Sequence, residues 1–185
     1  MTLTDAEWTM SDDVQRSIYV GPWRVDIVRR AGVEQAVSGA GIARQVQRAL
    51  RASQAPEPGS VTVVLTDDPE LADLNREHMG HEGPTDVLSF PMLSPEVFRS
   101  QRQRVAQGTG RTHIGDIAIS VERAAMQASE GRGGQTGDVR WSTSDELRLL
   151  VTHGTLHLCG WDHGEPDDEA AMRSLEQGLL TSPEG

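Results

Sequence analysis

Four short stretches of the chain carry the side-chain pattern of β-strands. Residues 23–28 alternate between apolar and polar side chains, and residues 60–66 form a short β-branched run. Both patterns are typical of strands. The predicted strands are 23–28, 60–66, 85–91 and 113–120.

Other stretches repeat apolar residues at helical spacing. Residues 41–52 place an apolar side chain at every fourth position, with arginines on the other side. Capping residues mark helix boundaries: Asp68 before Pro69 at one start, Ser144 or Thr143 at another, and Gly160 as a stop. The predicted helices are 41–52, one beginning at Pro69, 121–130, 144–160 and 166–180.

Three stretches show neither the strand pattern nor the helical spacing. The acidic N-terminal residues predict a flexible tail over 1–20. Residues 131–138 are rich in glycine and predict a flexible connection, and the polar stretch 92–111 is longer than most loops, which indicates function or disorder. Because strands and helices intermingle elsewhere, we expect a single domain of mixed α/β (α+β) class over residues 21–182.

Composition restricts where the protein acts. No apolar run approaches the roughly 20 residues needed to span a bilayer, and the acidic N-terminus lacks the apolar core of a secretory signal. A single cysteine, Cys159, excludes an intramolecular disulfide and fits a reducing compartment. We therefore expect a cytoplasmic protein with no membrane partner.

Charge argues against broad electrostatic contact with nucleic acid. The chain has 28 acidic and 17 basic residues, all of the latter arginine, for a net charge of −11. Binding through bulk electrostatics requires a basic surface, so we expect no DNA partner. The charge is nevertheless uneven, because residues 24–51 and 88–140 are net positive.

Three of the six histidines lie close together near the C-terminus. His153 and His157 are four residues apart, so they project from one face of the predicted helix. Gly160 permits the left-handed turn that brings His163 back as a third ligand. Three imidazole nitrogens leave one tetrahedral position for water, which is typical of a catalytic zinc, and we expect one Zn²⁺ per chain.

Other interpretations of this segment remain. A single histidine on a helix is usually structural, and Cys159, on the far side of the helix, is better explained as a small buried side chain than as a ligand. The spacing is also that of metzincin proteases, which need a glutamate directly after the first histidine. Gly154 occupies that position and cannot accept a proton, so a metallopeptidase is the weaker alternative.

Together, the segments HGTLHLCGWDH (153–163), GPTDVLSFP (83–91) and HIGDIAIS (113–120), with the pair Leu74–Asn75, resemble the bacterial YbeY family of endoribonucleases. The resemblance covers roughly residues 23–180. It implies a zincin-like fold with a mixed four-stranded sheet packed against helices, and a zinc ion held by the three histidines on a helix and the turn after it.

The same resemblance implies cleavage of phosphodiester bonds in single-stranded RNA. The implied task is 16S rRNA 3′-end maturation and ribosome quality control, with precursor ribosomal RNA and small-subunit components as partners, and we expect a monomer. One position departs from the family pattern: Met79 stands where the family commonly carries an arginine. Arg76 or an arginine of residues 99–111 could take over its contact with phosphate.

The sequence leaves the proton acceptor open between two carboxylates. Asp162 and Asp86 are candidates for the general base, and Asp162 could instead orient a ligand imidazole. Asp116 could cap a turn or brace the site. Trp161 could stack a base, although an aromatic residue here more often packs on its helix.

Attack by a zinc-activated water and attack by the RNA 2′-OH are both compatible with these residues. A non-catalytic ribosome assembly factor with a structural zinc is the main alternative function. If the protein is a nuclease, we expect the arginines of residues 24–51 and 88–140 to line a narrow approach to the histidines.

Overall fold

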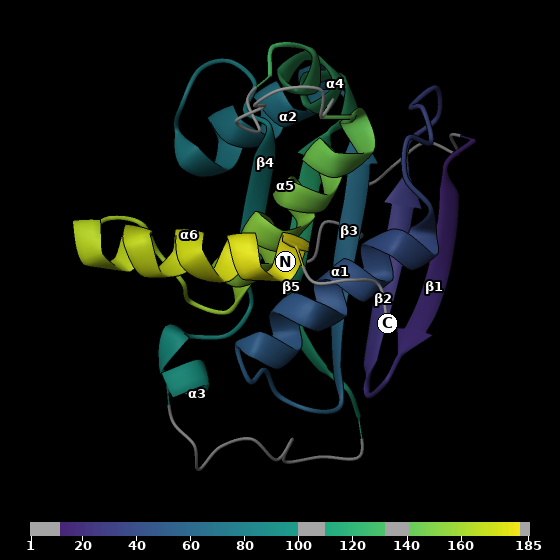
Figure 1. The fold of residues 1–185 in the computed structure, drawn as a ribbon. Coiled ribbons are helices and arrows are strands. Elements are labelled where there is room, and N and C mark those ends of the chain that lie inside the picture. The colour runs from purple at the N-terminus through teal and green to yellow at the C-terminus, as the bar shows by residue number, and fades with distance from the viewer. Residues whose placement is uncertain (1–11, 100–109, 132–140, 182–185) are drawn as a thin grey trace.

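The computed structural model describes residues 12–99, 110–131 and 141–181. Its strands form one mixed sheet in the order β1-β2-β3-β5-β4 (Figure 1). The central strands β2, β3 and β5 are parallel, and the edge strands β1 and β4 run antiparallel to their neighbours. The strands are β1 (Val14–Val20), β2 (Trp23–Arg29), β3 (Gly59–Thr66), β4 (Val87–Pro91) and β5 (Thr112–Ser120).

Helices α1 and α5 cover one face of the sheet, and α6 contacts both of them and extends to one side (Figure 1). The described helices are α1 (Gly39–Ala52), α2 (Asp68–Leu74), α3 (Pro95–Arg99), α4 (Val121–Ser129), α5 (Thr143–Leu158) and α6 (Pro166–Thr181). A single π-helical turn, η1 (Asn75–Met79), extends α2. The mixed α/β class expected from the sequence is confirmed.

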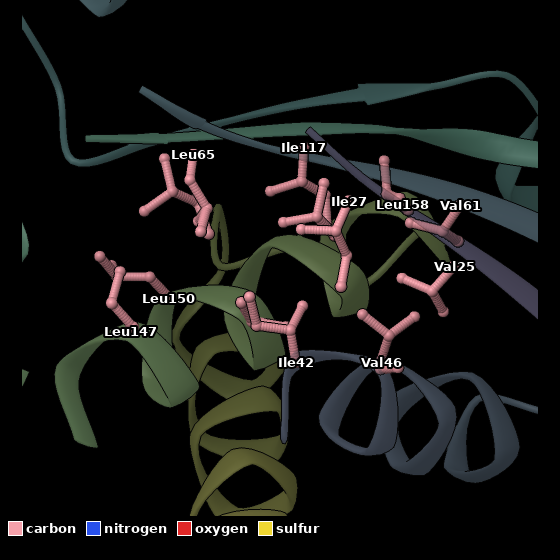
Figure 2. Close-up of a cluster of buried hydrophobic side chains, with 14 of the residues drawn as sticks. Val25, Ile27, Ile42, Val46, Val61, Leu65, Ile117, Leu147, Leu150 and Leu158 are labelled. Carbon is pink, nitrogen blue, oxygen red and sulfur yellow. The ribbon is translucent and has the colours of Figure 1, made fainter. Parts of the chain in front are cut away.

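The main hydrophobic core lies between the sheet and helices α1 and α5 (Figure 2). Val61, Leu65 and Ile117 of the sheet meet Ile42 of α1 and Leu150 of α5, and all are almost fully buried. Full burial of one such side chain contributes about 1.5–3 kcal/mol. This core fixes α5, and with it the two helical histidines, against the sheet.

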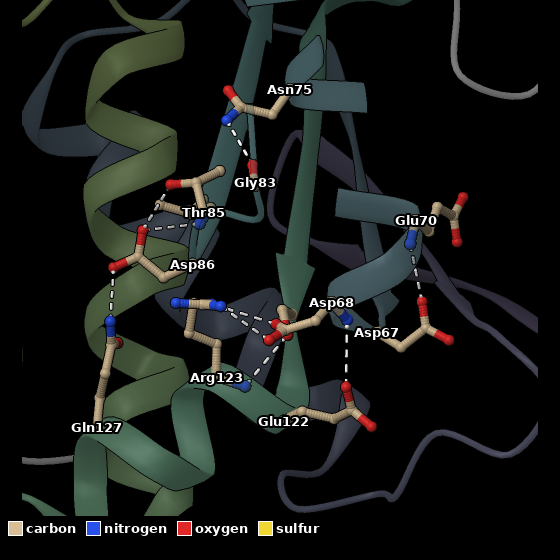
Figure 3. Close-up of polar contacts among 12 residues, drawn as sticks. Asp67, Asp68, Glu70, Asn75, Gly83, Thr85, Asp86, Glu122, Arg123 and Gln127 are labelled. Carbon is tan, nitrogen blue, oxygen red and sulfur yellow. Dashed lines mark hydrogen bonds and ion pairs between the residues drawn. The ribbon is translucent and has the colours of Figure 1, made fainter. Parts of the chain in front are cut away.

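A smaller cluster lies on the opposite face of the sheet, where Leu71 of α2 covers Val64 and Ala118. Asp68 at the start of α2 accepts hydrogen bonds from Arg123 Nη2 at 2.9 Å and Ser120 Oγ at 2.5 Å (Figure 3). These contacts join α2 to the start of α4, beside strand β4.

The structure corrects the predicted N-terminal tail. Residues 14–20, expected within a flexible tail over 1–20, form β1, so the sheet has five strands and not four. Most side chains of β1 are exposed, and therefore the strand lacks the apolar period by which the others were found. Its hairpin partner β2 and the left-handed Gly21 (φ +57°) between them position it. Residues 1–11 lie outside the described chain.

Three smaller predictions also change. Helix α2 is capped by Asp67 rather than Asp68, whose backbone is already helical. Helix α5 is capped by Ser142, not by Ser144 or Thr143. The stretch 92–111 contains the short helix α3, while its residues 100–109 lie outside the described chain, as do residues 132–138 of the glycine-rich stretch.

Candidate metal centre

A capping box fixes the start of α5. The Ser142 side chain accepts a hydrogen bond from the Asp145 backbone N–H, and the Asp145 carboxylate accepts one from the Ser142 N–H at 3.0 Å. One turn inside, the buried Glu146 carboxylate accepts a hydrogen bond from Trp141 Nε1 at 2.7 Å. These contacts satisfy backbone donors that a helix start leaves free and secure the helix that carries His153 and His157.

The end of α5 turns the chain back, as the sequence predicted. Gly160 is left-handed (φ +80°), its N–H donates to His157 O at 3.0 Å, and the Trp161 N–H donates to Leu156 O at 3.1 Å. This pair of bonds is the Schellman motif. A Cβ at Gly160 would also lie 2.9 Å from Pro95 of α3. The turn therefore requires glycine, and it brings His163 back towards the helix.

The three histidines converge. One ring nitrogen from each of His153, His157 and His163 lies within 4.8 Å of the other two. The Nε2 atoms of His153 and His157 are 3.0 Å apart. Two nitrogens bound to one tetrahedral zinc at about 2.0–2.1 Å stand roughly 3.3–3.4 Å apart, so the observed spacing fits a shared metal ion.

The remaining ring nitrogens of the two helical histidines have acceptors. His157 Nδ1 lies 2.9 Å from Trp161 O, and His153 Nδ1 lies 3.1 Å from Glu176 Oε1 of α6. Because a carbonyl oxygen only accepts, the proton of His157 lies on Nδ1 and the Nε2 lone pair is left for a metal. Glu176 sets the same tautomer on His153.

Glu176 is a site residue that the sequence reasoning missed. Its side chain is only 15 % exposed, although it is a carboxylate on a helix with few buried positions. The available signal was its place four residues after the apolar Met172, which puts it on the same face of the predicted helix 166–180. An acid at such a position needs a polar partner, and His153 is that partner.

Burial favours the neutral form of the His157 imidazole. Desolvation lowers the pKa of His157, and the nearby His153 lowers it further, while the hydrogen bond to Trp161 O opposes the shift. A neutral ring is the form that binds a metal ion.

Beside the histidines lies a cleft of about 340 Å³. It is lined by Asp86, Val87, Leu149, His153, His163, Glu169, Met172, Arg173 and Glu176. The cleft thus joins β4, α5, the turn after it and α6. Its described lining contains three carboxylates and one arginine.

Asp86 is the predicted carboxylate that the fold brings into this cleft. Its Oδ1 accepts from the Val87 N–H at 2.9 Å and from Thr85 Oγ1 at 3.1 Å, and its Oδ2 accepts from Gln127 Nε2 at 3.1 Å (Figure 3). The buried Asn75 donates to Gly83 O at 2.8 Å, which braces the loop leading to Asp86.

Asp162 lies elsewhere. It is exposed, lines a separate cleft on the other side of the turn, and accepts a hydrogen bond from the His163 backbone N–H at 2.8 Å. It therefore braces the turn. The role of orienting an imidazole, which the sequence suggested for Asp162, falls to Glu176 and the Trp161 carbonyl because those acceptors face the rings.

The arginines expected around the histidines are placed differently. Arg76 is 57 % exposed, pairs with Asp73 at 2.6 Å and does not line the cleft. Arg111 donates to Pro22 O at 2.5 Å, near the other end of the sheet. Among the described residues, no arginine of 24–51 or 88–140 lines the cleft, so that expectation is wrong for this part of the chain. Arg102, Arg104, Arg132 and Arg140 lie outside the described ranges.

Gly154 is explained by packing. A Cβ there would lie 2.9 Å from Ile117 Cγ2 and 3.1 Å from Ser89 Oγ, so α5 approaches the sheet too closely for any larger side chain. Ser89 Oγ also donates to Gly154 O at 3.2 Å. The glutamate that a metzincin needs at this position has no room, which argues against the peptidase.

Three further predicted residues have structural roles. Trp161 packs against the core, and its Nε1 donates to Ser53 Oγ at 3.1 Å. Cys159 is buried, and desolvation raises the pKa of its thiol to about 12. The fully buried Asp116 lies 2.8 Å from His113 Nε2, on the sheet face opposite α5.

Comparison with known proteins places these features in a family. Residues 30–184 match the sequence model of the family described as Endoribonuclease YbeY. Relatives of that name include one from Thermobifida fusca, 39 % identical over 84 % of this chain and 91 % of the relative. Another, from Chloroflexus aggregans, is 39 % identical over 80 % of this chain and 88 % of the relative.

A solved structure from Thermotoga maritima is also similar, with a TM-score of 0.49, 22 % identity, and coverage of 85 % of this chain and 86 % of that chain. Separately, no helix of the described residues combines the length and apolar character needed to cross a membrane.

Proposed function

Because the chain belongs to the YbeY family of endoribonucleases, we propose that it is a zinc-dependent enzyme that cleaves single-stranded RNA. The observation that carries the proposal is the convergence of three imidazole nitrogens beside an open cleft. The catalytic unit is one domain, residues 21–182 as expected from the sequence with β1 added at its edge.

The three histidines hold the metal. His153, His157 and His163 supply neutral nitrogens, and Glu176 with the Trp161 carbonyl keeps the first two rings in orientation. When bound, Zn²⁺ supplies a Lewis acid for a phosphoryl oxygen and lowers the pKa of water. Zinc suits this all-nitrogen, three-ligand set, which leaves a position open.

Asp86 is the carboxylate that we assign as proton acceptor. It lines the cleft with His153 and His163, and three hydrogen bonds fix its orientation. A positioned carboxylate can take a proton from the attacking oxygen of water or of a 2′-OH. Asp162 is the weaker candidate because it lies across the turn from this cleft.

The cellular task that we propose rests on family membership. It is maturation of the 16S rRNA 3′ end and ribosome quality control, in the cytoplasm. The protein acts as a monomer on precursor ribosomal RNA together with small-subunit components.

Metal analysis and RNA cleavage, measured in parallel, test the proposal. We expect one zinc per chain in the purified protein and cleavage of single-stranded RNA oligonucleotides. His157→Ala should lose both. The matched control is His81→Ala, since His81 is an exposed histidine outside the cleft.

Undiminished cleavage by the purified His157→Ala variant would contradict the enzymatic proposal. Full zinc occupancy with normal binding to ribosomal particles, but no cleavage of any RNA, would instead favour the non-catalytic assembly factor.

A further inference from the structure

The cleft beside the histidines has an unusual charge balance for a site that receives RNA. Asp86, Glu169 and Glu176 contribute three carboxylates to its described lining, and Arg173 is the one arginine there. A phosphodiester is an anion, and these carboxylates oppose its approach. A cation on the cleft wall is therefore the feature that RNA binding at this place requires.

The Arg173 side chain is held loosely enough to contact a phosphate. Its Nη2 lies 2.6 Å from Glu169 Oε1, one helical turn earlier on α6, and the two side chains are 66 % and 48 % exposed. Ion pairs exposed to this degree contribute little to stability. The guanidinium can therefore exchange the Glu169 carboxylate for a phosphate at small cost.

Two other arginines of the described chain hold parts of the fold together. Arg30 is 15 % exposed and pairs with both Asp13 and Glu70. Arg123 makes two hydrogen bonds to Asp68 between α2 and α4. Arg173 differs from these in both exposure and position.

We propose that Arg173 binds a backbone phosphate of the RNA in this cleft and that Glu169 holds the guanidinium ready and competes with that phosphate. The inference rests on the proposed function, because it names the substrate contact of the same site. The planar guanidinium offers two parallel N–H donors that match two phosphate oxygens, which an ammonium group cannot do.

Steady-state cleavage of a single-stranded RNA oligonucleotide tests the contact. Arg173→Gln should raise KM by about ten- to a hundredfold, as expected for loss of a hydrogen bond between charged groups. The slope of log KM against log salt concentration should fall by about 0.7, the value for one phosphate contact on a single strand. Arg173→Lys should recover part of the loss, since it restores the charge without the fork.

Glu169→Gln should act in the opposite direction. Removing the competing carboxylate should lower KM by about two- to fivefold, the range of an exposed ion pair. A merely structural role for the Arg173–Glu169 pair predicts instead that both substitutions weaken binding equally, together with a lower thermal unfolding midpoint.

Arg16→Gln is the matched control. Arg16 is exposed on β1, the edge strand farthest in sheet order from β4, and its loss changes the net charge by the same amount. KM should not change. If Arg173→Gln matches the control, or Glu169→Gln raises KM, the inference is overturned.

Fluorescence anisotropy with the same oligonucleotide separates this inference from the proposed function. Weaker binding by Arg173→Gln supports the phosphate contact even if the wild-type protein cleaves no RNA. If the wild-type protein cleaves RNA, and it and Arg173→Gln bind the oligonucleotide equally, the proposed function stands and the inference about Arg173 is overturned.

Discussion

At the scale of single residues, metal binding at the candidate site depends on which ring nitrogen of each histidine carries a proton. The spacing of His153 and His157 could be recognised in the sequence because helical geometry fixes it locally. The acceptors on their Nδ1 atoms could not, since Glu176 is 23 residues from His153 and meets it only when α6 packs on α5. These acceptors leave the Nε2 lone pairs available for a metal ion.

Replacing Glu176 should therefore weaken metal binding without removing a ligand. We expect Glu176→Gln to reduce zinc affinity by about 10- to 100-fold, because the amide orients His153 less firmly and no longer raises its basicity. Competition against a chromophoric chelator measures the change. Glu77→Gln, an exposed acid on η1, is the control; equal affinities in both variants would show that Glu176 does not support the ligand.

At the scale of elements, the distance between α5 and the sheet determines which side chains fit beside the histidines. Gly154 lets α5 lie against Ile117 and Ser89. This places His153 in the same cleft as Asp86, which directly precedes β4. The same close approach leaves no room for a glutamate at position 154. The apolar periods predicted α5 and its neighbours, whereas β1 escaped detection because an exposed edge strand needs no buried face.

Gly154 of α5 and Gly178 of α6 provide a contrast. Gly154→Ala should destabilise the protein by about 1–3 kcal/mol, because its Cβ overpacks the interface with the sheet. Gly178→Ala on α6, where a Cβ meets nothing within 4 Å, should stabilise it by about 0.5–1 kcal/mol. Chemical denaturation of both variants checks the signs; a neutral Gly154→Ala would mean that α5 can shift.

At the scale of the whole molecule, the candidate site gathers parts of the chain that are otherwise separate. α5 supplies two histidines, the following turn supplies the third, and α6 supplies Glu176 and Arg173. The net charge of −11 is thus compatible with RNA if a single cation and a metal ion, rather than a basic face, receive the phosphate.

Metal removal should consequently lower global stability. A ligand present at 100 times its Kd stabilises the folded state by about 2.7 kcal/mol. For a chain of this size that corresponds to a fall in Tm of roughly 5–10 °C on adding a chelator. Differential scanning calorimetry measures it. His153→Ala should show no fall, and an equal fall in that variant would place the effect outside the histidines.

The sequence by itself determined the local features: the spacing of His153, His157 and His163, the left-handed turn at Gly160, most strands and helices, and the family resemblance. The first three depend on neighbours within a few turns of chain, and the resemblance depends on the order of the sequence motifs. Only the tertiary structure decided that Asp86 rather than Asp162 enters the cleft, that Glu176 orients His153, and that Arg173 is the arginine beside them. These choices depend on how α5, α6 and β4 pack, and local sequence does not encode packing between distant segments.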